Sequence, residues 1–267
     1  MTIVVIVNAD DFGLCREITA GIVRAHEEGI VTSTSVAVNG AYFKDGLPLL
    51  KGCGIDAGIH LTLTGGEAPV SGTIEGLVDG SGLFLRSYRE VAPRIVLGRF
   101  DRDALRRELS EQIGMLRDSG VPVSHMDSHQ HLHLLPGIRD IAIELAHRFK
   151  IRWIRVPSAR GAGARGLVMN VLGRGLKVRL REHGLAFTDW FGGFEHRGHM
   201  AGARLSSLVK GLGNGITELM VHPGYDASAV YNWGYAWEDE LEALTSEDMK
   251  AMIKEMGIRL TSFKEIE

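Results

Sequence analysis

The segment TIVVIVNADDFG, residues 2–13, carries the strongest fold signal in the chain. Its β-branched run predicts a strand that is covered on both faces, as in a parallel sheet. The strand then ends in two adjacent carboxylates, Asp10 and Asp11, followed by Phe12 and Gly13. This ending has two interpretations: a solvated turn that leads into a helix, or a catalytic pair at the carboxyl end of the first strand.

Similar β-branched runs alternate with helical patterns along the rest of the chain, which is typical of repeated βα units around a parallel sheet. The other strand candidates are residues 32–39, 56–63, 123–128, 151–157, 185–191, 216–222 and 258–263. The helix candidates are residues 15–29, 100–120, 138–150 and 245–257. About eight strands in this length favour an α/β fold with one (β/α) barrel domain, residues 1–267, and a doubly wound open sheet is the alternative.

The bulk properties exclude some classes of partner. The formal net charge is −3, so nothing in the overall charge indicates a nucleic-acid partner. Cys15 and Cys53 have no metal-ligand spacing and are expected to be reduced thiols, which favours a cytoplasmic location. The first apolar run is too short for a signal or membrane-spanning helix. We therefore expect a cytoplasmic protein, or one that is peripheral to a membrane.

Polar residues follow several of the predicted strands at the point where each strand ends. In barrels and open parallel sheets, these carboxyl ends meet at the same edge and build the active site. Packing alone rarely produces such a set, because unpaired charges are seldom buried. The residues are Asp10, Asp11, His60, Asp127, His129 and His222.

The run HMDSHQHLH, residues 125–133, is the densest group of titratable side chains. If the run stays extended, its alternate residues share one face; these are His125, Asp127, His129, His131 and His133. A single metal ion needs ligands from other elements as well. We therefore expect one or two ligands from this run, with the other side chains supporting them by hydrogen bonds.

Five segments, taken in order, resemble a known family. They are NADDFG (8–13), TSTSVAVNG (32–40), GIHLTLT (58–64), HMDSHQHLH (125–133) and MVHPG (220–224). Together they resemble the YdjC-like carbohydrate deacetylases, the family of the chitooligosaccharide deacetylase ChbG, over essentially the whole chain. This resemblance implies an irregular (β/α) barrel similar to that of the NodB-type polysaccharide deacetylases.

The resemblance also implies roles for individual residues. Asp11, His60 and His129 would hold the metal, Asp10 would be the general base, and His222 the candidate general acid. The implied reaction removes the N-acetyl group from an N-acetylated amino sugar in an oligosaccharide or glycolipid. Two alternatives stay open: a metal-dependent phosphoesterase or amidohydrolase on the same barrel, and a non-enzymatic protein that binds metal or sugar.

One divalent ion is expected as the cofactor. One carboxylate and two imidazoles favour zinc, whereas the resemblance favours magnesium, and manganese or cobalt suits the same ligands at higher coordination number. The substrate signals are weaker. Arg155 could bind substrate, orient a carboxylate or form a structural ion pair. Aromatic residues in glycine-rich contexts could stack on sugars or anchor loops: Trp190, Phe191, Tyr225, Tyr231, Trp233 and Trp237.

Two further stretches are ambiguous. Residues 64–88 are glycine-rich and long for a βα connection, so they are a candidate lid. Residues 165–184 predict a basic amphipathic helix, which either packs with a solvated outer face or contacts an anionic membrane surface. Membrane contact would suit the hopanoid-associated HpnK group of this family, whose substrate would be a glycolipid. Relatives also suggest a homodimer.

Overall fold

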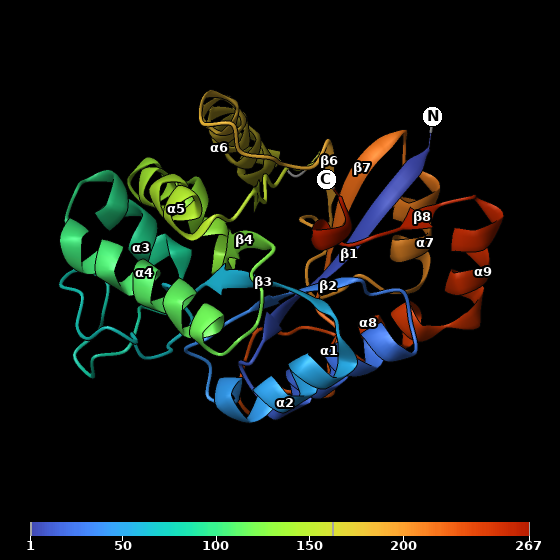
Figure 1. Ribbon diagram of the computed structural model, residues 1–267, viewed down its shortest axis with the longest axis horizontal. Helices are drawn as coiled ribbons and strands as arrows, with labels where there is room; N and C mark the ends of the chain where they lie inside the picture. Colours follow the sequence, from blue (N-terminus) through green and yellow to red (C-terminus); the bar gives the residue numbers. More distant parts are fainter. Residues whose placement is uncertain (1, 162, 267) are drawn as a thin grey trace.

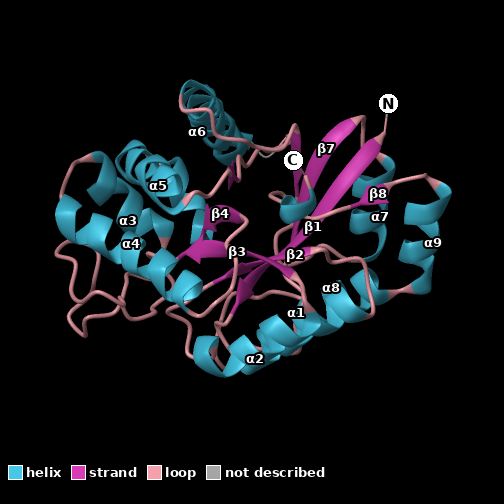
Figure 2. Cartoon of the chain, viewed as in Figure 1, coloured by secondary structure: helices cyan, strands magenta, loops and turns pink. Residues whose placement is uncertain are grey.

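The computed structural model describes residues 2–161 and 163–266, so residue 162 and both ends of the expected 1–267 domain lie outside the described ranges. One eight-stranded parallel sheet has the order β5-β4-β3-β2-β1-β7-β6, with β8 added to β1. Helices surround this sheet on its outer face (Figures 1 and 2). The strands are β1 Ile3–Phe12, β2 Ser33–Val36, β3 Asp56–Leu61, β4 His125–Ser128, β5 Trp153–Ile154, β6 Trp190–Gly192, β7 Gly215–Val221 and β8 Arg259–Leu260.

The sheet closes into a barrel only irregularly. Between β5 and β6 the wall is completed by a single bridge, in which the Ile154 amide donates to the Ala186 carbonyl at 2.9 Å. One edge of β1 is shared, because β8 pairs with its first half at Val4 and β2 pairs with its second half at Asn8. The predicted irregular (β/α) barrel is therefore confirmed. The strands predicted at residues 151–157 and 258–263 are only two residues long, at Trp153–Ile154 and Arg259–Leu260. The strand predicted at 185–191 lies at Trp190–Gly192, and Ala186 contributes only an isolated bridge to Trp153.

The four predicted helices are confirmed, and residues 165–182 of the predicted 165–184 helix lie in a fifth. These are α1 Arg16–Glu27, α4 Arg102–Asp118, α5 Pro136–Phe149, α9 Glu247–Glu255 and α6 Gly163–Glu182. Four helices were not predicted: α2 Phe43–Cys53, α3 Tyr88–Val96, α7 Gly202–Lys210 and α8 Trp237–Thr245. Pro48 lies inside α2 and Pro93 inside α3. Proline usually breaks a helix, so the sequence of these two segments gives no clear helical signal. Within the described ranges, none of these helices has the length and apolar character needed to cross a membrane.

Residues 64–87 form the long loop that the sequence predicts. The loop is held against the body of the protein by three fully buried side chains, Ile74, Leu77 and Phe84. Glu108 of α4 accepts hydrogen bonds from the amides of Val70 and Ser71 at 3.0 and 2.7 Å. The loop is thus anchored at its middle, and its action as a lid stays a prediction.

The two faces of β1 show how the barrel is filled. Val5, Val7 and Ala9 belong to the main apolar cluster, which also contains α1 residues. Ile6, on the other face, packs with Trp153 and Phe263 and fills the barrel near the amino ends of the strands. Asn8 and Asp10 are the next residues along that inner face, and both are buried. The barrel interior is therefore polar toward the carboxyl ends of the strands. This polar layer supports the candidate site.

Candidate metal centre

The end of β1 has an unusual backbone that brings its two carboxylates to one place. The pairing of β1 with β2 shifts register between Ala9 and Phe12, and Asp11 has a φ of 76°. Neighbouring residues on a regular strand point to opposite faces, but a positive φ breaks that alternation. Asp10 and Asp11 consequently line the same cleft. A non-glycine residue in this conformation is strained, which is common at functional sites.

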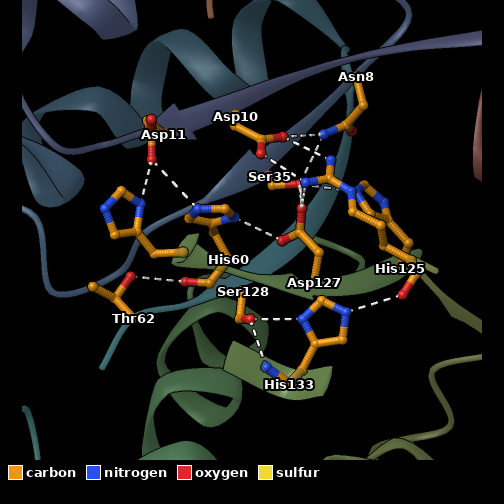
Figure 3. Close-up of polar contacts among 12 residues, drawn as sticks. Asn8, Asp10, Asp11, Ser35, His60, Thr62, His125, Asp127, Ser128 and His133 are labelled. Carbon is orange, nitrogen blue, oxygen red and sulfur yellow. Dashed lines mark hydrogen bonds and ion pairs between the residues drawn. The ribbon is translucent and has the colours of Figure 1, made fainter. Parts of the chain in front are cut away.

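Asp11, His60 and His129 lie close together at the carboxyl edge of the sheet. Figure 3 shows the side chains of Asp11 and His60 facing each other. Asp11 Oδ1 lies 3.3 Å from His60 Nε2 and 3.2 Å from His129 Nδ1. All three side chains are buried. The three elements that supply them are β1, β3 and the short 3₁₀ helix η1 His129–Leu134, which follows β4.

This donor set fits a divalent cation. One carboxylate oxygen and two imidazole nitrogens lie within 4.8 Å of one another. Asp127 fixes the orientation of the His60 ring. His60 Nδ1 donates to Asp127 Oδ1 at 2.7 Å, which leaves His60 Nε2 facing Asp11. A ligand histidine that donates its other nitrogen to a carboxylate is the usual arrangement in metal sites. The sequence placed Asp127 at a strand end but did not give it this role.

Charge also favours a cation at this point. Burial opposes ionisation of Asp11, but His129 and His60 together hold the pKa of Asp11 well below its usual range. Burial likewise opposes a charged His60, yet Asp127 and Asp11 raise the pKa of His60 well above its ordinary value. The carboxylates therefore create a negative potential that a proton on His60 or a metal ion can satisfy.

Arg155 connects Asp10 to the interior of the barrel. Its Nη1 and Nη2 donate to the two oxygens of Asp10 at 2.6 and 2.7 Å, in a bidentate pair. Nη1 also lies 2.5 Å from Asp127 Oδ2, and Nε donates to Glu218 Oε1 at 2.6 Å. Only 1% of Arg155 is exposed, and its contacts combine two of the roles considered for it: a structural ion pair, and orientation of the Asp10 carboxylate.

Three carboxylates share this single guanidinium. Burial raises the pKa of Glu218 to about 7 despite the nearby Arg155, and Glu218 Oε2 has no partner among the described residues. Burial also opposes ionisation of Asp127, but Arg155 and His60 keep its pKa well below the usual range. A proton on Glu218 relieves the excess negative charge beside Arg155, while Asp127 stays ionised. Glu218 had one sequence signal, a lone acid within an apolar strand.

The remaining histidines of residues 125–133 lie outside the donor set of Asp11, His60 and His129. The run is not extended beyond Ser128, since Gln130 and His131 have φ values of 54° and 57°. The expectation of one shared face is therefore wrong past that residue. The His125 ring stacks on that of Phe263 inside the barrel, with 4.0 Å between ring centroids. His131 lines the cleft.

His133 is buried as a neutral ring. Its Nε2 donates to the Arg155 carbonyl at 2.9 Å, and Ser128 Oγ donates to its Nδ1 at 2.6 Å. Burial lowers the pKa of His133 to about 4 from its ordinary 6.5. Between these two pH values the unfolded chain binds a proton here that the folded chain does not, so stability falls as the pH falls.

His133→Gln removes this titration and should change how stability depends on pH. The difference in free energy of unfolding between wild type and His133→Gln should shrink by about 1.4 kcal/mol per pH unit as the pH falls from 6.5 to 4. Urea unfolding at a series of pH values measures this difference. A difference that is constant across the window would contradict a neutral, buried His133.

His222 follows β7 and faces the same cleft. Its backbone amide donates to Glu240 Oε2 at 2.6 Å, which fixes the turn after the strand. Its ring lies edge-on to Tyr235, with 5.1 Å between centroids. His222 lines the cleft, and its buried Nδ1 has no hydrogen-bond partner among the described residues.

Only one of the predicted sugar-stacking aromatics lines the cleft. That residue is Trp233, whose ring lies 5.3 Å from that of His129. Phe191, Tyr231 and Trp237 are buried, which is the anchoring role that the sequence left open. Tyr235 also lines the cleft and was not predicted.

Residues 4–255 match the family described as YdjC-like protein. The chain belongs to the YdjC-like family. Among the curated relatives, a carbohydrate deacetylase of Brevibacillus brevis is 31% identical and aligns over 98% of both chains. A chitooligosaccharide deacetylase of Yersinia enterocolitica is 32% identical over 97% of this YdjC-like chain and 98% of its own. A human carbohydrate deacetylase is 31% identical over 98% of this chain and 90% of its own.

Solved structures agree with the fold of this YdjC-like chain. A crystal structure of a protein from Enterococcus faecalis has a TM-score of 0.79 at 24% identity and covers 99% of each chain. The lactam utilization protein of Thermus thermophilus has a TM-score of 0.52 at 13% identity, over 98% of this chain and 100% of its own. At these identities the likeness concerns the barrel alone.

Proposed function

We propose that the protein is a metal-dependent carbohydrate N-deacetylase, which hydrolyses the N-acetyl group of an amino sugar in an oligosaccharide or glycolipid. The observation that carries this proposal is the difference between the two adjacent carboxylates. Asp11 lies with His60 and His129, whereas both oxygens of Asp10 accept hydrogen bonds from Arg155. A site that only binds a metal has no need for the second, fixed carboxylate.

The roles proposed for the residues follow from amide hydrolysis. Asp11, His60 and His129 would hold one divalent ion, and that ion, when bound, polarises the acetyl carbonyl and the attacking water. Asp10 accepts a proton from the water as general base, and Arg155 keeps its carboxylate in one orientation. His222, which also lines the cleft, gives a proton to the departing nitrogen. Trp233 offers its ring to a sugar face.

The phosphoesterase alternative is less consistent with the charges of the site. Such enzymes often hold two metal ions, about 4 Å apart. A second donor set does exist, formed by Asp10, His60 and Asp127. Its two carboxylates already share the Arg155 guanidinium, and His60 also belongs to the first set. A second cation would have to displace that buried charge, so we propose a single ion.

Acetate release from a panel of N-acetylated sugars tests the function. The panel contains N-acetylglucosamine, chitobiose, longer chitooligosaccharides and N-acetylglucosaminyl lipids. We expect release from at least one class, its loss after chelation and its recovery on addition of zinc, magnesium, manganese or cobalt. Hydrolysis of phosphate esters without acetate release, together with two tightly held ions per chain, would overturn the proposal. The metal that restores most activity also decides between zinc and magnesium.

His222→Ala should lower turnover far more than metal content. Its proposed task is donation of a proton to the leaving amine, and loss of such a group usually costs about a hundredfold to ten-thousandfold in rate. The loss should be smaller for acetyl esters with good leaving groups, which need no proton. Rates on the two substrate types, with metal content as the control, measure this. An equal loss on both types would give His222 a positioning role instead.

Several finer expectations stay predictions. These are the cytoplasmic location, the homodimer, membership of the HpnK group and contact with a membrane through residues 165–184. Exposed apolar side chains on α6 motivate the prediction of membrane contact. Leu167, Val171 and Val178 are 66%, 57% and 53% exposed. Salt-sensitive binding to anionic liposomes would support membrane contact.

A further inference from the structure

The cleft at the metal centre extends well beyond the residues proposed for metal binding and catalysis. It has a volume of about 660 Å³ and runs between α3 and α6 over η1. Its far part is lined by apolar side chains that offer no hydrogen bonds to sugar hydroxyls. These are Ala92 of α3, Leu134 of η1, and Val168, Met169 and Leu172 of α6. A lining of this kind suits an apolar chain rather than further sugar units.

Cations gather beside this apolar part. Arg89, Arg165 and Arg197 line the same cleft. A hydrogen bond from Arg89, and the charges of Arg165 and Arg197, lower the pKa of Tyr88 between them. In the described part of the chain, no carboxylate lies within ion-pair distance of these three guanidinium groups. Their positive charge is therefore available to a ligand.

We propose that the substrate is an N-acetylated sugar joined, through a negatively charged group of the phosphate type, to an apolar chain. This inference rests on the proposed function and names the class of aglycone for that same site. The acetyl group lies at Asp11 and His129, the anion among the arginines around Tyr88, and the chain along α3 and α6. Guanidinium groups bind phosphate oxygens in bidentate fashion, which makes phosphate the best match to this cluster.

Binding of decyl phosphate to the metal-loaded protein tests the proposal without any acetyl group. The ligand is titrated below its micelle concentration by calorimetry, beside inorganic phosphate and the neutral decyl glucoside. We expect decyl phosphate to bind at least about tenfold more tightly than either, because burial of each methylene and contact with the arginines both contribute. Equal binding of decyl phosphate and inorganic phosphate would overturn the apolar chain. Equal binding of decyl phosphate and decyl glucoside would overturn the anion.

Matched variants locate the binding. Arg165→Gln should weaken decyl phosphate about tenfold, whereas Arg174→Gln, an exposed arginine of the same helix outside the cleft, should not. Val168→Asn should weaken decyl phosphate but not inorganic phosphate. Val178→Asn is its control, since the two valines are 58% and 53% exposed and only Val168 lines the cleft. Unchanged affinity in Arg165→Gln would mean that the phosphate binds at the metal instead, and would overturn the proposal.

The outcomes separate this inference from the deacetylase proposal. Acetate release from neutral chitooligosaccharides, without the expected binding pattern, overturns the anionic apolar aglycone alone. The binding pattern without acetate release from any sugar overturns deacetylation alone.

Discussion

Asp10→Asn should lower deacetylation by roughly a hundredfold or more while the metal stays bound. The substitution keeps the shape of the side chain and removes the base. It should not unfold the protein, because Asp127 and Glu218 still face Arg155 in the buried group. The metal should stay, because the ligand atoms proposed for it belong to Asp11, His60 and His129.

Steady-state rates of acetate release, with metal content measured on the same samples, test this expectation. Asp140→Asn is a suitable control, since Asp140 is a surface carboxylate that also contacts an arginine, Arg139 at 3.1 Å. That variant should keep the wild-type rate. A wild-type rate in Asp10→Asn would remove the general base from the account and leave the carboxylate as part of a turn.

Arg155→Met should cause the largest loss of stability among single substitutions in the site. It leaves Asp10, Asp127 and Glu218 buried without their shared cation. Loss of one partner from a buried ion pair costs about 3–5 kcal/mol. That is a large part of the roughly 5–15 kcal/mol by which a domain is stable. Urea unfolding measures the change, and Arg106→Met is the control.

Arg106 makes contacts with Asp103 and Glu144, but its side chain is 34% exposed. Loss of an exposed pair of this kind costs about 0–1 kcal/mol. Arg155→Lys separates stability from catalysis, because lysine keeps the charge but lacks the planar fork that holds Asp10. It should be more stable than Arg155→Met and still slow. A fully active Arg155→Lys would show that the orientation of Asp10 is unimportant.

The convergence of Asp11, His60 and His129 could be predicted from sequence for a physical reason. Asp11 and His60 lie in the last residues of β1 and β3, and His129 directly follows β4. The carboxyl ends of parallel strands meet at one edge. The strand pattern predicts about eight parallel strands but leaves an open sheet as the alternative, and the irregular barrel was implied by the family resemblance. The pattern indicated a wider set of strand-end residues, and the individual roles came from the family resemblance: Asp10 as base, Asp11, His60 and His129 as ligands, and His222 as acid.

The residues behind the site could not be predicted in the same way. The contacts of Arg155 with Asp10 and Glu218 join residues that are 145 and 63 positions apart, and no local pattern records such distances. The far part of the cleft depends on α3, which contains Pro93 and was therefore not predicted. The histidines after Ser128 were assigned to one face because a left-handed backbone at Gln130 and His131 leaves no trace in the residue types.

Metal binding by Asp10→Asn and Asp11→Asn, measured side by side, tests the central claim most directly. Each apoprotein is titrated with the metal that best supports acetate release, and the rate is followed at every metal concentration. The account predicts that Asp10→Asn binds one ion per chain with near wild-type affinity but stays slow at saturation. Asp11→Asn should bind the ion at least about tenfold more weakly and regain part of its rate in excess metal. The reverse result, with the ion lost from Asp10→Asn and kept by Asp11→Asn, would contradict the division between base and ligand.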